Sequence, residues 1–435
     1  MFIKKFTKKL TLITVTAITL GTSLFSSIPA FADESGFEAA AESAIAIDEK
    51  TGKIFYAKDA DKVRGIASIT KILTVYLVLD QIKSGKLKWD DKVEIDDYTY
   101  AISSDNNLSN VPLEPNAKYT VKELYEAALI SSANACAIAL ATKVAGSEKK
   151  FVALMNKQVK KWGITDAKLI NSTGLNNENI PEQYRYPNSS PTEENQMSAK
   201  DVALIAQHLI QDFPEVLETT KKTEGKFGVG TSSEVDMQTW NWMLPDMDYA
   251  YEGVDGLKTG TTTEAGQCFV GTATRKDWRI ITVVLHADNS DLDTGARFTA
   301  TGELMDFVYN NWSQKEILKK GTTFKNVKPY PVKDGKEKEV ALELNAPVTT
   351  WIRSDMDDEK YKVDFRSGKE KELIAPVDKG TVAGMVTVSL EQDNLGYILK
   401  KDKVEYPMVA KKSIKRSNFF AIIGEHFLEF INSHL

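Results

Sequence analysis

Two short stretches of this chain place a serine three residues before a lysine. Ser68 and Lys71 open the stretch IASITKILTVYLVL, which is almost wholly apolar after the lysine. Residues i and i+3 share a face of a helix, so the amine can reach the hydroxyl. A lysine desolvated to its neutral amine can take the proton of a serine, which is a poor nucleophile without such a base. Ser68 and Lys71 are thus a candidate nucleophile and base, whereas Ser147 and Lys150 lie in a polar, lysine-rich segment that is typical of solvated surface.

A serine two residues before an asparagine also occurs twice, at 104–106 and at 132–134. The first lies in the polar run SSDNNLSN, where serine and asparagine are common for turn formation alone. Ser132 and Asn134 instead interrupt two apolar helical segments, where polar side chains either enter a site or cap a helix. We therefore favour Ser132 and Asn134 as the functional pair, with simple capping as the alternative.

The triplet Lys258-Thr259-Gly260 occurs once, on a predicted edge strand. Gly260 removes a side chain where a ligand backbone could lie alongside the strand. An ordinary strand followed by a turn would also explain the triplet by itself.

The elements expected around these motifs form an α+β domain over residues 37–312. Its pattern predicts an antiparallel sheet flanked by helices, in which the first and last strands come from opposite ends of the region. Thr120 and Glu123 match a helix-capping box, and Ser198 is a plausible N-cap. The expected strands are 43–57 (two, around a turn) and a three-stranded meander over 254–287; the expected helices are 68–83, 120–130, 134–145, 198–213 and 295–312; residues 176–197 are expected to be a long surface loop.

The C-terminal third has a different composition. Short β-rich runs alternate with turn signals from 313 to 409 and predict a separate all-β domain.

Residues 411–435 predict an amphipathic helix with a basic lead-in, which suits binding in the plane of a membrane surface. A helix docked on the β-domain is the alternative. One apolar face would carry Phe419, Phe420, Ile423, Phe427, Phe430 and Ile431.

Residues 1–32 have the features of a secretory signal peptide. Four lysines precede an apolar stretch, and Ala30-Phe31-Ala32 fits the small-x-small cleavage rule. A retained membrane anchor is the alternative. We expect export, with the mature protein on the outer face of the cytoplasmic membrane. Cleavage removes four lysines and no acid and would take the formal net charge from −6 to −10, and such an acidic protein is a poor candidate for binding nucleic acid.

The remaining chemistry-bearing residues are few. Cys136 and Cys268 both lie in apolar segments, so two buried thiols are favoured over one disulfide. The sequence has no HExxH or similar metal spacing and no phosphate-binding loop. We expect no metal and no cofactor.

Taken together and in this order, S-x-x-K, S-x-N and K-T-G resemble the motif set of the penicillin-recognising serine DD-peptidases. The chain most resembles the low-molecular-mass D-alanyl-D-alanine carboxypeptidases, from about residue 38 to the C-terminus. The 64-residue step from Ser68 to Ser132 is similar to that of the family, and the 36-residue step to Ser104 is not.

The resemblance implies a role for each motif. Ser68 would be acylated with Lys71 as base, Ser132 and Asn134 would move a proton and hold the substrate amide, and Lys258 would supply positive charge. The backbone N–H groups of Ser68 and Thr261 would form an oxyanion hole. The terminal carboxylate would bind Thr259 and Arg297 beside Gly260, since an arginine suits a carboxylate by its two-pronged geometry.

The implied reaction removes the terminal D-alanine from peptidoglycan stem pentapeptides ending in D-Ala-D-Ala, which limits cross-linking, and β-lactams would acylate Ser68. A class A β-lactamase shares the three motifs, but no glutamate of the 176–197 segment is followed by leucine-asparagine at the spacing of its E-x-x-L-N loop. A DD-endopeptidase would use the same residues, and a catalytically idle wall-binding protein on this fold is the non-enzymatic alternative.

Overall fold

A five-stranded antiparallel sheet organises the N-terminal part of the protein. The computed structural model describes residues 36–399 and 404–434, so the predicted signal peptide lies outside the described residues. The strand order is β2-β1-β11-β10-β9. The sheet takes its first and last strands from opposite ends of this region, as the sequence predicts, and the structure shows that these two strands pair directly, from Ala41 opposite Ala287 to Asp48 opposite Ile280. The strands are β1 (Ala41–Asp48), β2 (Ile54–Lys58), β9 (Val254–Thr262), β10 (Gly266–Arg275) and β11 (Trp278–Ala287).

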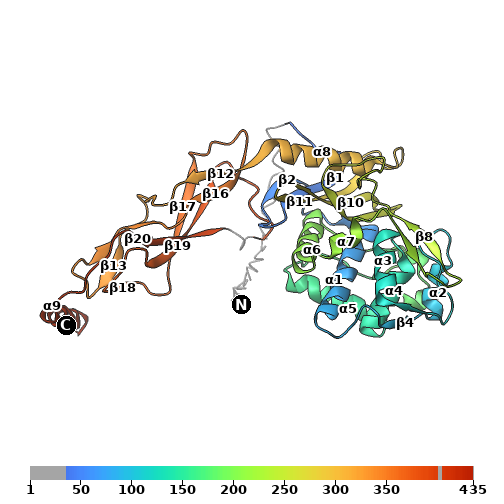
Figure 1. The fold of residues 1–435 in the computed structure, drawn as a ribbon, viewed down its shortest axis with the longest axis horizontal. Helices are drawn as coiled ribbons and strands as arrows, with labels where there is room; N and C mark the ends of the chain where they lie inside the picture. Colours follow the sequence, from blue (N-terminus) through green and yellow to red (C-terminus); the bar gives the residue numbers. More distant parts are fainter. Residues whose placement is uncertain (1–35, 400–403, 435) are drawn as a thin grey trace, which may run out of the picture. The chain divides into compact units, whose positions relative to one another are not determined.

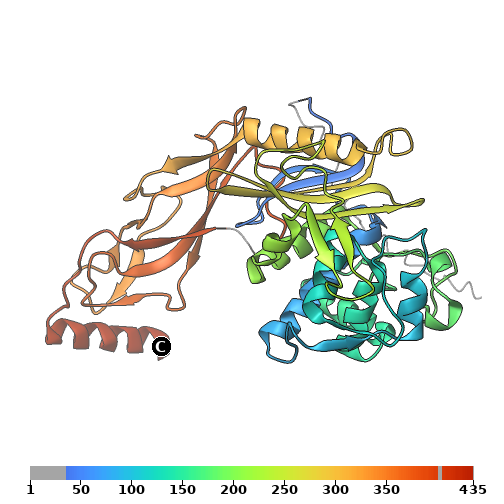
Figure 2. The same ribbon diagram turned by 45° about the vertical axis from the view of Figure 1, so that its right-hand side comes forward.

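The two faces of this sheet are covered by different helices (Figures 1 and 2). Side chains alternate along a strand, so Ile45 and Ile47 of β1 pack into a large core with the main group of helices. Ala44 and Ala46 face the other way and pack under α8 (Ala296–Asn311). This is the α+β domain expected from the sequence, and the two faces explain why its strands contain runs of apolar residues instead of alternating with polar ones.

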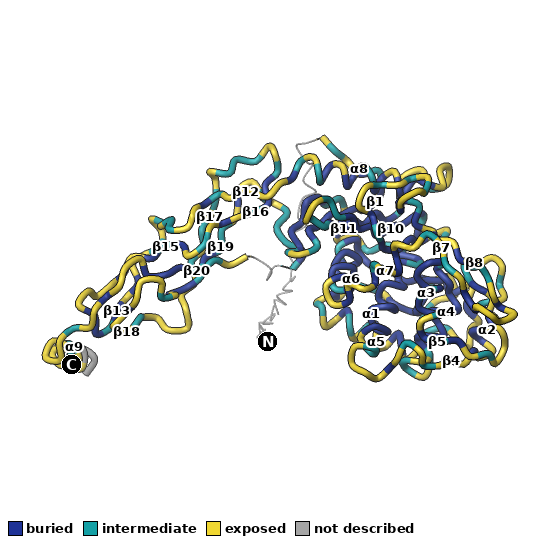
Figure 3. Tube along the Cα trace, viewed as in Figure 1, coloured by how far each residue is buried: buried dark blue, intermediate teal, exposed yellow. Residues whose placement is uncertain are grey.

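The helices on the first face surround α1 (Lys71–Lys83), a helix that is buried over most of its length. In α1, every residue from Lys71 to Leu79 is buried, as the colouring of Figure 3 shows. A 3₁₀ turn, Ala67–Thr70, precedes α1, so Ser68 lies in this turn and not in the α-helix itself. The other helices of this face are α2 (Asp97–Ser103), α3 (Val121–Ile130), α4 (Asn134–Ala145), α5 (Glu148–Lys161), α6 (Ala199–Asp212) and α7 (Val216–Thr220).

The predicted helix starts are confirmed at two positions. Thr120 and Glu123 form the capping box of α3, and Ser198 forms one with Asp201 at the start of α6. Ser147 caps α5 by accepting a hydrogen bond from the Lys150 backbone, so the second S-x-x-K pair has a purely local role. Short strand pairs complete this part: β3 (Arg64–Gly65) with β6 (Gln196–Met197), β4 (Lys92–Glu94) with β5 (Lys118–Thr120), and β7 (Glu224–Phe227) with β8 (Val235–Gln238).

The prediction of a surface loop over 176–197 is wrong for its two ends. Asn177 and Asn195 are fully buried, and Glu194 is 3% exposed. Asn177 donates to Ser189 Oγ and the Ser190 carbonyl, which holds the segment against itself. Polar composition suggested solvent, but these side chains satisfy backbone groups inside the fold.

The C-terminal part is built from short strands, and no helix occurs among the described residues from 313 to 409. Its largest sheet has the order β15-β20-β19-β17, and a three-stranded sheet contains the one parallel pair in the described chain, β13 with β18. The strands are β12 (Trp312–Leu318), β13 (Tyr330–Lys333), β14 (Glu339–Val340), β15 (Leu342–Leu344), β16 (Val348–Arg353), β17 (Tyr361–Ser367), β18 (Leu373–Ile374), β19 (Val382–Leu390) and β20 (Glu405–Ala410).

The chain ends in α9 (Phe419–His434), which starts eight residues after the predicted position. The basic residues that precede it are not helical, and Lys412 pairs with Glu337 instead. His426 contacts Asp334 of the β-rich part at 3.0 Å and Glu425 pairs with Lys338, whereas Phe420 is 84% exposed. Within the residues that the structure describes, no helix is both long and apolar enough to cross a bilayer.

Candidate active site

The side chains of Ser68 and Lys71 meet at the junction of the 3₁₀ turn and α1. The Nζ atom of Lys71 lies 2.9 Å from Ser68 Oγ. Lys71 is completely buried, and no acidic side chain pairs with it among the described residues. Burial, and next the positive charge of Lys258, lower the pKa of Lys71 well below its ordinary value. This shift favours the neutral amine, which is the form that can accept a proton.

Lys71 has two further contacts, and both are with carbonyl oxygens. Its Nζ donates to Asn134 Oδ1 at 2.7 Å and to the Thr173 backbone carbonyl at 3.0 Å. A carbonyl can only accept, whereas the Ser68 hydroxyl can also donate. In a neutral lysine the two amine hydrogens thus satisfy the carbonyls, and the lone pair is left for the Ser68 proton.

The S-x-N motif begins in the short connection between α3 and α4 and ends at Asn134, the first residue of α4. Ser132 is 4% exposed with a φ of 56°, and Asn134 is 2% exposed. The capping explanation for this motif is wrong, since the N-cap of α4 is Ala133 and has no side-chain cap. Asn134 instead bridges the site: its Oδ1 accepts from Lys71 and its Nδ2 donates to the Ser109 carbonyl at 3.0 Å.

A loop that sequence reasoning missed supplies the third contact of Lys71. Residues 171–174 are held by side chains facing inward: Asn171 Oδ1 accepts from the backbone N–H groups of Thr173 and Gly174. The buried Glu148 accepts from the Ser172 N–H at 2.9 Å and from its hydroxyl at 2.6 Å. These bonds fix the direction of the Thr173 carbonyl. The only feature of the sequence that points to this loop is a run of small, mostly polar residues, NSTG, before a leucine.

The K-T-G motif lies on β9, whose outer edge has no partner strand in the five-stranded sheet. Gly260 packs against the turn that carries Ser68, because a Cβ at this position would lie 2.6 Å from the Ile66 carbonyl oxygen. The glycine therefore allows close approach of β9 to the Ser68 turn, and the unpaired edge of β9 could pair with an extended ligand.

Lys258 is buried at 2% exposure and donates to the Thr259 carbonyl at 3.0 Å. Burial, followed by the charge of Arg297, lowers the pKa of Lys258 to about 7. Two buried lysines thus lie close enough to influence one another. An anion entering the site would relieve this repulsion.

Arg297 lies behind the end of β9. It donates to the Gly260 carbonyl at 2.9 Å and to Thr261 Oγ1 at 2.7 Å, and it also contacts the Cys268 carbonyl and Gln267. The structure therefore shows Arg297 bracing β9 and β10. The role of Arg297 in binding a carboxylate, and that of Thr259, stay predictions.

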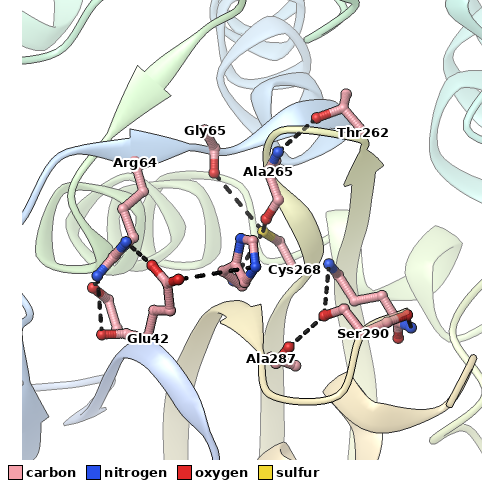
Figure 4. Close-up of polar contacts among 11 residues, drawn as sticks. Glu42, Arg64, Gly65, Thr262, Ala265, Cys268, Ala287 and Ser290 are labelled. Carbon is pink, nitrogen blue, oxygen red and sulfur yellow. Dashed lines mark hydrogen bonds and ion pairs between the residues drawn. The ribbon is translucent and has the colours of Figure 1, made fainter. Parts of the chain in front are cut away.

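The two cysteines are free and buried, as the sequence favoured. Cys268 lies below the end of the β9–β10 hairpin (Figure 4), with its Sγ 3.3 Å from the Ala265 carbonyl and 3.8 Å from that of Gly65. Burial raises the pKa of the Cys268 thiol to about 11. It is a packing group and not a nucleophile at neutral pH.

Comparison with known proteins agrees with this geometry. Residues 30–289 match the family described as D-alanyl-D-alanine carboxypeptidase, and residues 312–416 match the C-terminal domain of penicillin-binding protein 5. The chain is 30% identical over 385 residues to the D-alanyl-D-alanine carboxypeptidase DacF of Bacillus subtilis, with 88% of each chain covered.

Solved structures give the same result. A peptidoglycan synthesis regulatory factor (PBP3) from Streptococcus pneumoniae is 42% identical with a TM-score of 0.72, covering 87% of this chain and 100% of that one. Penicillin-binding protein D2 of Listeria monocytogenes, in its cefotaxime-bound form, is 31% identical with a TM-score of 0.50, covering 62% of this chain and 98% of that one. With its α+β peptidase part and all-β C-terminal part, the chain belongs to the D-alanyl-D-alanine carboxypeptidase family of serine hydrolases among the penicillin-binding proteins.

Proposed function

We propose that this enzyme removes the terminal D-alanine from peptidoglycan stem pentapeptides through an acyl-enzyme on Ser68. The observation that carries the proposal is the buried Lys71 amine, 2.9 Å from Ser68 Oγ, with carbonyl acceptors for its hydrogens. The amine takes the hydroxyl proton as Ser68 Oγ attacks the carbonyl carbon of the penultimate D-alanine. The backbone N–H groups of Ser68 and Thr261 stabilise the resulting oxyanion.

Release of the product needs a proton on the leaving amine. The proton that Lys71 accepted returns through Ser132, while the amide of Asn134 holds the peptide. The terminal carboxylate binds near Lys258, Thr259 and Arg297, where positive charge is concentrated. Water then hydrolyses the Ser68 ester, again with Lys71 as base, and the free hydroxyl is restored.

The experiment uses the full chain in mild detergent with a diacyl-L-Lys-D-Ala-D-Ala peptide, and it measures released D-alanine. Wild-type protein should release D-alanine and Ser68→Ala should not. Ser147→Ala, which changes the other S-x-x-K pair, is the matched control and should keep full activity. No release from folded wild-type protein would contradict the proposal, and cleavage of cross-linked dimers alone would identify an endopeptidase.

We also propose that β-lactams acylate Ser68 and inhibit the enzyme. The support is membership in this family and the likeness to a relative solved with bound cefotaxime. Fast turnover of penicillin, instead of a persistent adduct, would identify a β-lactamase.

A location outside the cell, at the membrane surface, is proposed from the two ends of the chain. The N-terminal sequence supports export. In α9 the polar Glu425 and His426 contact the β-rich part, which leaves aromatic side chains outward: Phe419, Phe420, Phe427 and Phe430 are 59–84% exposed. A helix docked through its apolar face would show the reverse.

Sedimentation with anionic phosphatidylglycerol vesicles tests the membrane contact. The full chain should bind, and Phe420→Glu with Phe427→Glu should reduce binding at least tenfold, because each change removes a large apolar side chain and adds a charge. Leu292→Glu alters an 88% exposed leucine far from α9 in sequence and should bind like wild type. Unchanged binding of the double variant would contradict the proposal.

A further inference from the structure

Glu194 is a buried carboxyl group that no step of the proposed reaction uses. It is 3% exposed, and no cation pairs with it in the described part of the chain. One oxygen, Oε2, accepts a hydrogen bond from Thr262 Oγ1 at 2.7 Å, and the other has no hydrogen-bond partner among the described residues. Burial, with the nearby charge of Glu264, raises the pKa of Glu194. Such a group is costly to bury, so its retention calls for a reason.

On one side, Glu194 belongs to a segment that holds the entry to the Ser68 turn. The backbone carbonyl of the next residue, Asn195, accepts a hydrogen bond from the Ile66 N–H at 3.1 Å. The side chain of Asn195 donates a hydrogen bond to Thr70 Oγ1 at 3.0 Å. Gln196 lies opposite Gly65 in the β3–β6 pair. The free oxygen of Glu194 rests against Gly65, where a Cβ would lie only 2.0 Å from it.

On the other side, Glu194 holds the end of β9. Thr262 directly follows Thr261, and its hydroxyl also accepts the Ala265 N–H at 2.9 Å, which closes the β9–β10 hairpin. Figure 4 shows Thr262, Ala265 and Gly65 together at this end of the sheet. The Glu194 carboxyl thus spans two segments that are distant in sequence, one leading to Ser68 and one carrying Thr261.

We propose that Glu194 is a positioning residue that sets the spacing between the Ser68 and Thr261 backbone N–H groups. The inference rests on the proposed function, in which these two groups form the oxyanion hole. On one side, Arg297 donates a hydrogen bond to the Thr261 hydroxyl. On the other side, Glu194 accepts a hydrogen bond from Thr262, the following residue, and so holds it near the Ser68 turn. The feature required of Glu194 is a hydrogen-bond acceptor at Oε2, because the Thr262 hydroxyl donates to this oxygen.

The test compares Glu194→Ala and Glu194→Gln in the full chain. Acylation by a fluorescent penicillin is resolved into initial binding and the acylation rate constant, and affinity is measured for a peptide boronic acid, whose tetrahedral adduct places an oxygen in the oxyanion hole. In Glu194→Ala the acylation rate and boronate affinity should both fall about 10- to 100-fold, since misplaced oxyanion donors lose most of their effect. Initial penicillin binding should change less than threefold.

Glu194→Gln should stay within about threefold of wild type, because its amide oxygen can accept the Thr262 hydrogen bond. Thr262→Val provides a second route if Glu194→Ala does not fold: it should reproduce the loss, and Thr262→Ser should not. Glu193→Gln is the control in the same segment, since Glu193 pairs with Lys168 instead.

Wild-type acylation rates in Glu194→Ala, or equal losses in Glu194→Gln and Glu194→Ala, would overturn the positioning role. So would a fall in initial binding with an unchanged acylation rate. Absence of Ser68-dependent acylation in the wild-type protein would instead refute the proposed function itself.

Discussion

Replacement of Gly174 by alanine should disable the site without touching any side chain that acts on substrate. Gly174 has a φ of 85°, and a Cβ there would lie 1.8 Å from the Ala67 carbonyl oxygen and 2.9 Å from the Ser68 backbone nitrogen. Ala67 itself has a φ of 45°. The new methyl group would therefore press on a peptide unit that is already in an uncommon conformation and that positions the nucleophile.

The size of the effect follows from these distances. A Cβ contact must open from 1.8 Å to at least 3.0 Å, a shift of about 1.2 Å. Adding a methyl group to a packed interior costs about 1–3 kcal/mol, and a positive φ costs a non-glycine residue roughly 1–2 kcal/mol. The free energy of unfolding should thus fall by about 2–5 kcal/mol. A displacement of about 1 Å in a reacting group can cost 100-fold in rate, so kcat/KM should fall at least that far.

The assay pairs D-alanine release and penicillin acylation with thermal unfolding, all at a temperature where the variant is folded. Gly146→Ala is the matched control: its φ is 78°, but nothing lies within 4 Å of the added Cβ. It should lose only about 1–2 kcal/mol and no activity. If Gly174→Ala kept at least half of the wild-type acylation rate, contact between this loop and the Ser68 peptide would not control the position of the nucleophile.

Three further predictions concern titration and buried polar groups. kcat/KM should follow a bell-shaped pH profile: it falls toward acid as Lys71 becomes protonated, and toward alkali as Lys258, with a pKa of about 7, loses its charge. In Lys258→Arg the alkaline fall in kcat/KM should move to higher pH. If it stays at the same pH, the fall is caused by the titration of another group. Asp393→Ala should destabilise the fold by about 3–5 kcal/mol in chemical denaturation, because it leaves the buried ammonium of Lys53, now 2.8 Å from Asp393, without its carboxylate. Asp236→Ala, in an exposed pair with Lys226, should destabilise the fold far less. Equal losses in the two variants would show that burial of the Lys53–Asp393 pair does not determine the cost. Glu148→Ala should lower the acylation rate about tenfold or more, because Ser172, in the loop that carries the Thr173 carbonyl, loses the carboxylate that accepts its hydrogen bonds. A variant with lower stability but an unchanged acylation rate would show that Glu148 only supports folding.

Periodicity and local turn chemistry predicted most of the peptidase fold. The strands β1, β2 and β9–β11 and the helices α3, α4, α6 and α8 were identified from the sequence, because local residues determine their apolar pattern and caps. The S-x-x-K pair at Ser68 was distinguished from that at Ser147 because only the first opens an apolar helix.

The contacts that complete the site could not be predicted in this way. The Thr173 carbonyl, Glu148 and Glu194 depend on how the segments 171–177 and 193–197 fold inward, and their polar composition indicates a surface loop instead. Thr262, the partner of Glu194, is 68 residues away in sequence, and Lys71, the partner of the Thr173 carbonyl, is 102 residues away. Only the tertiary structure shows that these polar side chains satisfy one another inside the fold.

The proposed reaction depends on acylation of Ser68. The most direct measurement is the mass of the full chain after incubation with benzylpenicillin, followed by mapping of the modified peptide. One adduct with the mass of the whole antibiotic should form on the peptide that contains Ser68, and none should form in Ser68→Ala. An adduct on any other peptide, or an equal adduct in Ser68→Ala, would contradict the proposed reaction.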